Sequence, residues 1–395
     1  MTSARFHKWT GAGIGAAFLM ATSAIGPGFL TQTTVFTQQL MTSMGFVILC
    51  SVIIDIIAQL NIWLALTANR KRGSELANEV IPGSGHFLTL LICFGGLAFN
   101  IGNISGCGLG LNILFPVSVE TGSIISAVVA IVLFLVKDAA RAMDLFVKLL
   151  GIVMLLLMLY VAVTTHPPVA EVMHRSIVPD TINLTSIVTL VGGTVGGYIT
   201  FAGAHRMLEE KKIPEQKEVK RSAVSGILIT ACMRVLLFLA VLGVLTMGAT
   251  LDSSNPAASV FQSALGIAGY KIFGIILWSA AITSVVGSAF TSISFLKTLH
   301  PVFEKNHRST TIVFIIISTI IFVLIGKPVT ILVLAGALNG FILPFSLGLI
   351  LWVMMKRRQS NQQHPAWLLW SGWVVVVVML WMSTITFINE LPKLF

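Results

Sequence analysis

The chain has 395 residues, of which 56% are hydrophobic and 10% charged, and its mean hydropathy is +0.93. This composition indicates a polytopic membrane protein and excludes a mainly soluble one. The formal net charge of +10 follows from the charges of alternate loops, so it does not indicate a nucleic-acid partner.

Apolar segments that are long enough to cross a bilayer recur along the whole chain. The hydrocarbon core is about 30 Å thick and takes about 20 apolar residues as a helix. We therefore expect eleven helical spans, at residues 12–41, 45–68, 87–114, 122–137, 143–164, 184–208, 222–248, 270–297, 309–326, 328–355 and 366–389. The sequence predicts an all-α integral membrane protein that forms one domain.

Lysine and arginine gather in every second loop, which marks the cytoplasmic side of a bacterial inner membrane. The basic positions are Arg5 and Lys8, Arg70 to Arg72, Lys137 to Lys148, Lys211 to Arg221, Lys297 to Arg308 and Lys356 to Arg358. We expect the N-terminus to be cytoplasmic and the C-terminus, after an odd number of spans, to be outside.

Spans 1–5 and spans 6–10 then have opposite orientations, as a 5+5 inverted repeat requires. Repeat one would cover about residues 12–164 and repeat two about residues 184–355. The last span, at about residues 366–389, would be an accessory helix.

Glycine and proline interrupt the first span of each repeat. Span 1 contains Gly26, Pro27 and Gly28 in GAAFLMATSAIGPGF, and span 6 contains Gly196 and Gly197 in GGTVGGY. Backbone at membrane depth leaves the helical ladder only where it is buried in protein or lines a cavity. Two matching breaks indicate the binding site of a secondary transporter. The free helix ends at such breaks suit an anionic or carbonyl group of a substrate. Close helix packing by small residues is the alternative.

The candidate substrate-binding residues lie at these breaks, just after them, and on span 10. They are Gly26, Pro27, Gly28, Phe29, Thr31, Gln32, Thr194, Gly196, Gly197, Tyr198 and Asn339. Gly26 and Gly196 are expected to enlarge the cavity by omitting a side chain. Pro344, shortly after Asn339, predicts a kink in span 10.

Other polar residues in mid-span are candidates for the permeation path or for ion coupling. Span 3 carries Asn100 and Asn103 on one face, and span 8 carries Ser288, Thr291 and Ser292 on one face. Hydroxyl groups, together with carbonyls of an unwound helix, can coordinate Na⁺. The alternatives are interhelical hydrogen bonds for the amides and bonds to the preceding turn for the hydroxyls.

Two ionisable residues lie clearly at mid-span, Asp55 in span 2 and Arg234 in span 7. An isolated charge at this depth is costly, and spans 2 and 7 are equivalent in the two repeats. The sequence therefore predicts a mutual salt bridge. Its role is either structural or part of coupling and gating.

At these motifs the chain resembles the Nramp family of proton-coupled divalent-metal transporters, which have the LeuT-like fold. The family's Asp-Pro-Gly-Asn motif in span 1 is matched here by Gly26 to Phe29, which retain only the proline and glycine. Its Met-Pro-His motif in span 6 falls on Gly196 to Tyr198, with neither methionine nor histidine.

Span 3 and span 10 extend the resemblance. The acidic pair of the family's proton route is matched by Asn100 and Asn103, which do not titrate near neutral pH. The family's NGxxLP pattern is retained at Asn339 to Pro344. The resemblance thus implies the family's scaffold without its usual metal ligands or proton route.

Desolvated Mn²⁺ or Fe²⁺ needs charged or soft ligands, and the matching positions offer neither a carboxylate nor a thioether. We therefore expect a secondary transporter that moves a small organic acid or amino-acid-like solute by alternating access. The branch of the family that the chain most resembles is often encoded beside 5-oxoproline-degrading enzymes in bacteria, which implies 5-oxoproline as a candidate.

Two other functions stay open: a carrier of Mn²⁺, Fe²⁺ or Mg²⁺, and a sensor that binds a solute without moving it. An enzyme is not expected, because no span offers a histidine base. The sequence has no Walker motif, so transport would be secondary or passive. We expect no cofactor and no resident metal, with Na⁺ or H⁺ as the coupling ion. The oligomeric state is left open.

Overall fold

The computed structural model describes residues 24–209, 215–357 and 364–390, which we call the described chain. Its elements are helices, and the described chain contains no strand, which confirms the all-α class. In chain order they are α2 (Pro27–Leu40), the 3-10 helix η1 (Met41–Ser43), α3 (Met44–Asn69), α4 (Gly73–Val80), α5 (Ser84–Leu114), α6 (Val119–Leu135), α7 (Lys137–Thr164), α8 (Val169–Arg175), α9 (Leu184–Val195), α10 (Ile199–Glu209), α11 (Gln216–Thr246), α12 (Pro256–Leu296), α13 (Pro301–Lys305), α14 (His307–Ile325), α15 (Pro328–Arg357) and α16 (Ala366–Glu390).

Helices overlap the expected spans wherever the described chain reaches. Eight helical segments of that chain are long and apolar enough to cross a membrane, namely Pro27–Asn69, Ser84–Leu114, Leu184–His205, Gln216–Thr246, Pro256–Leu296, His307–Ile325, Pro328–Arg357 and Ala366–Ile388. The pair Leu149–Thr164 and Val169–Arg175, bent by 104°, would make a ninth. Helix α6 is a shorter apolar helix, and residues 12–23 of span 1 lie outside the described chain. The count of eleven spans stays a prediction.

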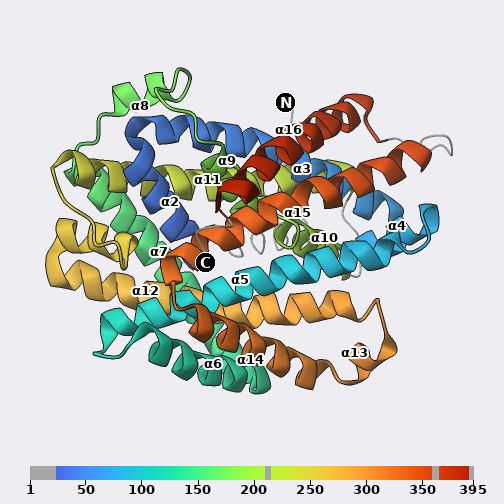
Figure 1. The fold of residues 1–395 in the computed structure, drawn as a ribbon, viewed down its shortest axis with the longest axis horizontal. Helices are drawn as coiled ribbons and strands as arrows, with labels where there is room; N and C mark the ends of the chain where they lie inside the picture. The colour runs from blue at the N-terminus through green and yellow to red at the C-terminus, as the bar shows by residue number, and fades with distance from the viewer. Residues whose placement is uncertain (1–23, 210–214, 358–363, 391–395) are drawn as a thin grey trace, which may run out of the picture.

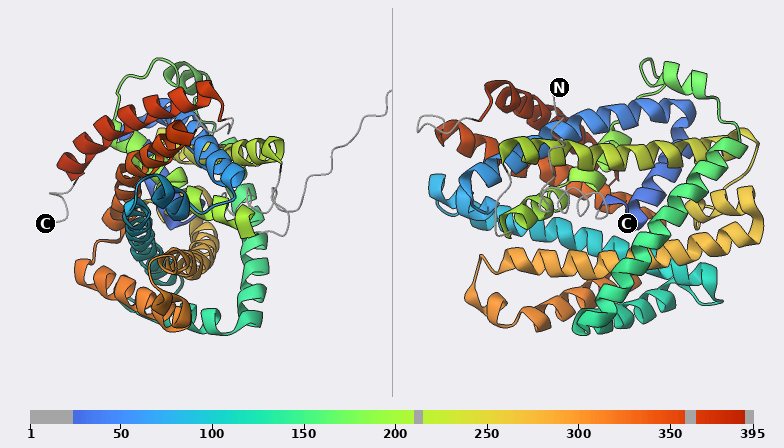
Figure 2. Two further views of the ribbon diagram at one scale, coloured as in Figure 1. Left: turned by 90° about the vertical axis from the view of Figure 1, so that its right-hand side faces the viewer. Right: turned by 180° about the vertical axis from the view of Figure 1, so that it is seen from behind.

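Helices α5, α11, α12 and α15 run in similar directions, with α5 and α12 side by side, whereas α7 crosses the bundle obliquely (Figures 1 and 2). Helix α15 packs against α9 and α5 and carries α16 on another side, while α6 and α14 cover the α5–α12 pair. The end-on view in Figure 2 shows α16 and α14 at opposite edges of the bundle. Helices α2, α3, α9 and α11 contact one another. Asp55 lies in α3 and Arg234 in α11, while α2 begins just after Gly26 and α9 ends just before Gly196.

The two ends of the bundle carry different loops (Figure 1). Helix α4, which follows the basic segment at residues 70–72, and helix α13, which lies within the basic segment at residues 297–308, are at one end. Helix α8, which lies in the expected outer loop, is at the other end. This separation agrees with the alternation of basic loops along the sequence.

Glycine permits the close helix contacts at the centre. A Cβ atom at Gly192 in α9 would overlap backbone atoms of Gly336 and Gly340 in α15. A Cβ atom at Gly110 in α5 would lie 2.7 Å from the backbone nitrogen of Trp278 in α12. Small residues thus let these helices approach through their backbones, as is common in membrane bundles.

Candidate functional site

The break in span 1 is described from Ala24 onward. Helix α2 begins at Pro27, and Gly26 before it has an extended backbone, with φ −118° and ψ −169°. Proline at the first helical position has no N–H to satisfy, and the N–H groups that follow it have no partner within the helix. The break therefore presents a helix N-terminus toward the centre of the bundle.

The space beside Gly26 is lined by polar atoms of two other helices. A Cβ atom at Gly26 would lie 3.6 Å from Oγ of Ser284 in α12 and 3.7 Å from Oδ1 of Asn103 in α5. These are ordinary contact distances, so the position has room for a methyl group. Pro27, by contrast, packs tightly on Gly106 of α5. The first break thus brings together Gly26, Pro27 and Asn103.

The second break separates α9, which ends at Val195, from α10, which begins at Ile199. Gly196 leaves the helical conformation with φ −46° and ψ 159°. A Cβ atom there would lie 2.5 Å from Cβ of Asn339 and would overlap the Gly192 carbonyl oxygen. Gly197 packs similarly against Ile342. The expectation that Gly196 enlarges a cavity is wrong, because α15 fills the space that its missing side chain leaves.

Asn339 connects helices rather than facing open space. Its Nδ2 donates to the carbonyl oxygens of Gly95 in α5 and Ala335 in α15, both at 3.0 Å. Helix α15 continues through Pro344, and the structure describes it as a single helix there. The side chain therefore contacts the second break through Gly196 and holds α15 against α5.

Gln32 joins helix α2 to helix α15. Its Nε2 donates to the Leu332 carbonyl oxygen in α15 at 2.7 Å, while its buried Oε1 has no hydrogen-bond partner within the described chain. A Cβ atom at Gly193 would lie 2.6 Å from this Oε1. Gly28 lies beside the same amide, and Thr31 is buried on α2. Gln32 is thus positioned between the two breaks.

Four residues form what we call the central charged cluster: Phe29, Asp55, Thr194 and Arg234. Arg234 is 2% exposed, and its Nη1 donates to the Thr194 hydroxyl at 3.0 Å. The guanidinium carbon lies 4.7 Å from the centroid of the Phe29 ring, within cation–π range. Phe29 lies just after the first break and Thr194 just before the second, so Arg234 links both breaks.

The predicted salt bridge between Asp55 and Arg234 is not formed in this conformation, because neither carboxylate oxygen of Asp55 pairs with a guanidinium nitrogen. Asp55 is 1% exposed and interacts electrostatically with Arg234, close to the Thr194 hydroxyl. Neither carboxylate oxygen has a hydrogen-bond partner within the described chain, and neither do Nε and Nη2 of Arg234. Asp55 and Arg234 therefore lie in one cluster, but without the direct ion pair that the sequence predicts.

Three other side chains form what we call the amide cluster: Asn100, Ser288 and Ser318. Nδ2 of Asn100 donates to Oγ of Ser318 in α14 at 3.0 Å, and Oγ of Ser288 in α12 donates to its Oδ1 at 2.8 Å. This arrangement supports the interhelical alternative for Asn100 and occupies the Ser288 hydroxyl that was proposed for Na⁺. Ser318 was missed, although it is a polar residue inside the apolar run IVFIIISTIIF.

Tyr198 meets the remaining coupling candidates on α12. Its hydroxyl interacts with Thr291, and its ring lies 6.1 Å from that of Phe99. Oγ of Ser292 is buried without a hydrogen-bond partner in the described chain and lies against Gly96. These residues surround the start of α10, apart from the charged cluster.

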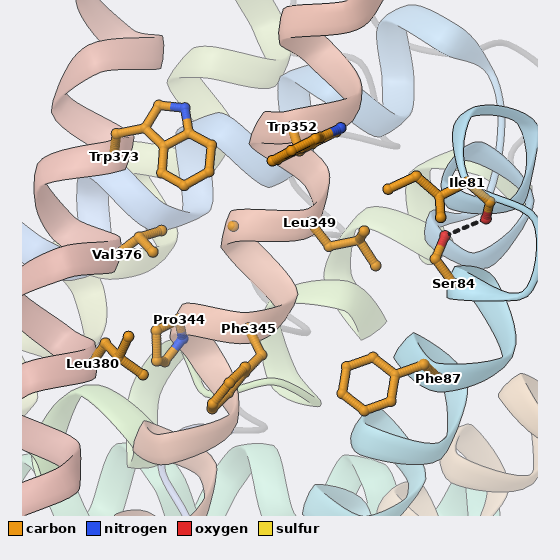
Figure 3. Close-up of a pocket in the computed structure, with 11 residues that line it drawn as sticks. Ile81, Ser84, Phe87, Pro344, Phe345, Leu349, Trp352, Trp373, Val376 and Leu380 are labelled. Atoms are coloured by element: carbon orange, nitrogen blue, oxygen red, sulfur yellow. Dashed lines mark hydrogen bonds between the residues drawn. The ribbon is translucent and has the colours of Figure 1, made fainter.

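An open groove of about 360 Å³ lies elsewhere, between the α4–α5 corner and helices α15 and α16 (Figure 3). Trp352, Trp373, Phe87 and Phe345 line it, and its one hydroxyl, that of Ser84, donates to the Ile81 carbonyl oxygen at 2.7 Å. Several of these side chains are exposed apolar groups. The groove contains none of the sequence-predicted site residues.

Solved transporters share this architecture. A manganese transporter of Eremococcus coleocola, in complex with an aromatic bis-isothiourea substituted compound, has a TM-score of 0.73 at 15% identity, covering 96% of this chain and 86% of that one. MhsT in complex with L-phenylalanine has a TM-score of 0.63 at 13% identity, covering 97% and 98%. The fold is therefore the LeuT-like fold of these transporters.

The chain belongs to the Nramp family, because the model "Natural resistance-associated macrophage protein-like" matches residues 17–389. It is 56% identical to the uncharacterized membrane protein YcsG of Bacillus subtilis over 387 residues, which cover 96% of this chain and 95% of the relative. An uncharacterized membrane protein of Haemophilus influenzae is 51% identical, covering 97% of each chain. The divalent metal cation transporter MntH of Pediococcus pentosaceus is 21% identical, covering 96% of this chain and 91% of the relative. Family and fold are those of transporters rather than enzymes.

Proposed function

We propose that the protein is a secondary transporter that moves a small organic acid across a bacterial inner membrane by alternating access. The observation that carries this proposal is the position of Arg234 between the two helix breaks. A fixed positive charge, the free amides of a helix N-terminus and the Gln32 side chain suit an anionic solute. The candidate 5-oxoproline has both a carboxylate and an amide.

Divalent-metal transport is the second candidate, because the family and the manganese transporter of similar fold favour it. The residues at the breaks argue against it. Gly26 and Gly196 offer no ligand, and the nearest side-chain oxygens to Gly26 are the neutral groups of Asn103 and Ser284. Transition-metal ions are held by charged or soft ligands, which neutral amides and hydroxyls do not replace.

Uptake into proteoliposomes tests this choice. Purified protein should take up labelled 5-oxoproline, lactate or acetate with saturation, and Mn²⁺ should not compete. Saturable uptake of Mn²⁺ or Mg²⁺ that organic acids leave unchanged would support the metal carrier. Binding of an organic acid without flux would support the sensor.

Orientation and repeat organisation belong to the same proposal. The alternate basic loops, and the position of α4 and α13 opposite α8, support a cytoplasmic N-terminus and an outer C-terminus. The proposed repeats are residues 12–164 and 184–355. Reporter fusions at the C-terminus and in the loop after Leu296 should report opposite sides.

A further inference from the structure

We propose that one edge of the Arg234 guanidinium binds the carboxylate of the transported solute, and that Asp55 binds a proton when it does so. This inference rests on the proposed function and names the group of the solute that is recognised and the coupling ion. It concerns the central charged cluster, where two buried charged side chains each have polar atoms without a partner in the described chain.

The unpartnered atoms of Arg234 form a carboxylate-binding edge. In a guanidinium, Nε–H and one N–H of Nη2 point the same way and match the two oxygens of a carboxylate. Nη1 lies on the other side and is held by the Thr194 hydroxyl at 3.0 Å. The face of the guanidinium is covered by the Phe29 ring. Thr194 and Phe29 therefore fix the group while leaving the two-donor edge unpaired.

Charge balance makes Asp55 the proton site. A buried site is most favourable when its net charge is zero, because an uncompensated charge at membrane depth costs several kcal/mol. Without solute, the charges of Arg234 and Asp55 cancel. When the solute brings a second negative charge to Arg234, neutrality is restored if Asp55 takes up one proton. One proton then moves with each monocarboxylate, and transport carries no net charge.

The surroundings of Asp55 offer no competing partner. Within the described chain, Arg234 is the charged group that interacts with it. Other elements that pack against α3 also carry titratable groups. Glu79 of α4 pairs with Lys71, and Glu171 of α8 accepts from Thr42. The His205 ring of α10 lies 4.3 Å from that of Phe295, and its Nε2 has no hydrogen-bond partner in the described chain. The charge of Lys220, near the start of α11, acts on His364.

The cluster also lies where binding can influence the conformation. Phe29 and Asp55 belong to the proposed first repeat, and Thr194 and Arg234 belong to the second. A carboxylate on Arg234 and a proton on Asp55 change the forces between α2, α3, α9 and α11, which contact one another. Binding energy at this point can therefore favour one arrangement of the repeats over another.

Transport measurements with labelled 5-oxoproline as the probe test the inference. In wild-type proteoliposomes, a pH gradient with the alkaline side inside should drive accumulation, and an imposed K⁺ diffusion potential should leave the rate unchanged. Competition by 2-pyrrolidinone, which has the same ring without the carboxylate, should be at least about tenfold weaker than by unlabelled probe, since charge-assisted hydrogen bonds are lost.

Variants test the carboxylate site at Arg234 and the proton site at Asp55 separately. Arg234→Lys keeps the charge but removes the two-donor edge, so the affinity should fall by at least about tenfold. Asp55→Asn should abolish accumulation driven by pH, and solute exchange should lose its pH dependence. Because Arg234→Met alone leaves Asp55 without a counter-charge, the double variant with Asp55→Asn provides a neutral cluster that should fold and still not bind the probe. Arg175→Met and Asp252→Asn, outside the membrane core, are the matched controls.

The outcomes distinguish this inference from the proposed function. Probe accumulation that persists in Asp55→Asn, that depends on Na⁺ instead of pH, or that carries net charge in the wild type would overturn the proton site. Unchanged affinity in Arg234→Lys, or binding by the double variant, would overturn the carboxylate site. Absence of wild-type uptake for every organic acid tested, with saturable Mn²⁺ uptake, would instead overturn the proposed function.

Discussion

The amide cluster and the central charged cluster are both buried polar groups inside one apolar bundle, but they are satisfied to different degrees. Asn100 has its donor and its acceptor occupied, by Ser318 and Ser288 respectively. In the charged cluster, both oxygens of Asp55 and two nitrogens of Arg234 lack partners within the described chain. Satisfied buried groups hold helices together, whereas a buried group without a protein partner is expected to meet a water, an ion or a ligand.

This difference separates the residues that resemble the family's proton route from those that we assign to coupling. The matched positions in α5 have become interhelical connections at Asn100, and Asn103 has become a neutral neighbour of Gly26. The charges of the bundle centre lie instead on α3 and α11.

The largest effect on stability is expected from removing one charge of the central cluster. Arg234→Met leaves Asp55 buried without a counter-charge, so the free energy of unfolding should fall by about 3 kcal/mol. Thermal unfolding of the purified protein in detergent measures this change. The double variant with Asp55→Asn should recover most of the loss. Equal stability of the single variant and the wild type would show that the two charges do not depend on each other.

The two breaks should respond differently to the same added methyl group. Gly196→Ala places a Cβ atom against Asn339 and backbone, so we expect a destabilisation of about 1–3 kcal/mol and a low yield of folded protein. Gly26→Ala has room and should fold, with weaker solute binding because the methyl group occupies the space beside Asn103. Size-exclusion profiles and probe affinity for both variants test this. A well-folded Gly196→Ala protein would contradict the observed packing of α15.

The amide cluster should contribute to stability but not to solute recognition. Asn100→Leu removes two interhelical hydrogen bonds, each worth about 0.6 kcal/mol on average in a membrane protein, so the loss should be about 1 kcal/mol. Probe affinity and its pH dependence should stay within about twofold of wild type. A loss of pH-driven accumulation in this variant would place the proton route through α5 after all.

A smaller, pH-dependent effect is expected outside the membrane spans, at the start of α16. Nε2 of His364 lies 2.8 Å from Oδ1 of Asn61, whose amide nitrogen donates to the Leu368 carbonyl oxygen. Burial, with a contribution from Lys220, lowers the pKa of His364 to about 4. Because an unfolded histidine has a pKa of about 6.5, the unfolded chain binds the extra proton first as the pH falls.

Stability contributed at His364 should therefore be fully present above about pH 6.5 and should be lost as the pH falls from about 6.5 toward 4. The melting temperature between pH 7.5 and 5 measures this, with His364→Gln as the variant that does not titrate. The fall in melting temperature from pH 7.5 to pH 5 should be smaller in His364→Gln than in the wild type. An identical drop in both proteins would assign the effect to other groups.

The sequence predicts the helices well, because helix formation depends on local properties. Apolar length locates the membrane helices, and the backbone is non-helical at Gly26 and Gly196, where glycine predicts it. That both first spans are broken helices stays a prediction, since residues 12–23 lie outside the described chain. Hydropathy and proline effects act on neighbouring residues, so a single chain is enough to recognise them. The helices at matching positions also made the inverted-repeat hypothesis possible.

Contacts between helices could not be predicted in the same way. Helical periodicity places Asn100 on a face but does not say that Ser318, 218 residues later, meets it. For the same reason the stacking of Arg234 on Phe29 and the packing of Asn339 against Gly196 were missed. Asp55 and Arg234 lie in one cluster, as equal depth indicates, but equal depth does not fix the distance between them.

Binding of labelled 5-oxoproline to purified wild type, Arg234→Lys and Asn100→Leu compares the two clusters in a single equilibrium measurement. We predict that Asn100→Leu binds like the wild type, whereas Arg234→Lys binds at least about tenfold more weakly because its ammonium lacks the two-donor edge. Unchanged binding in Arg234→Lys, or an equal loss in both variants, would contradict the assignment of the central charged cluster as the solute site.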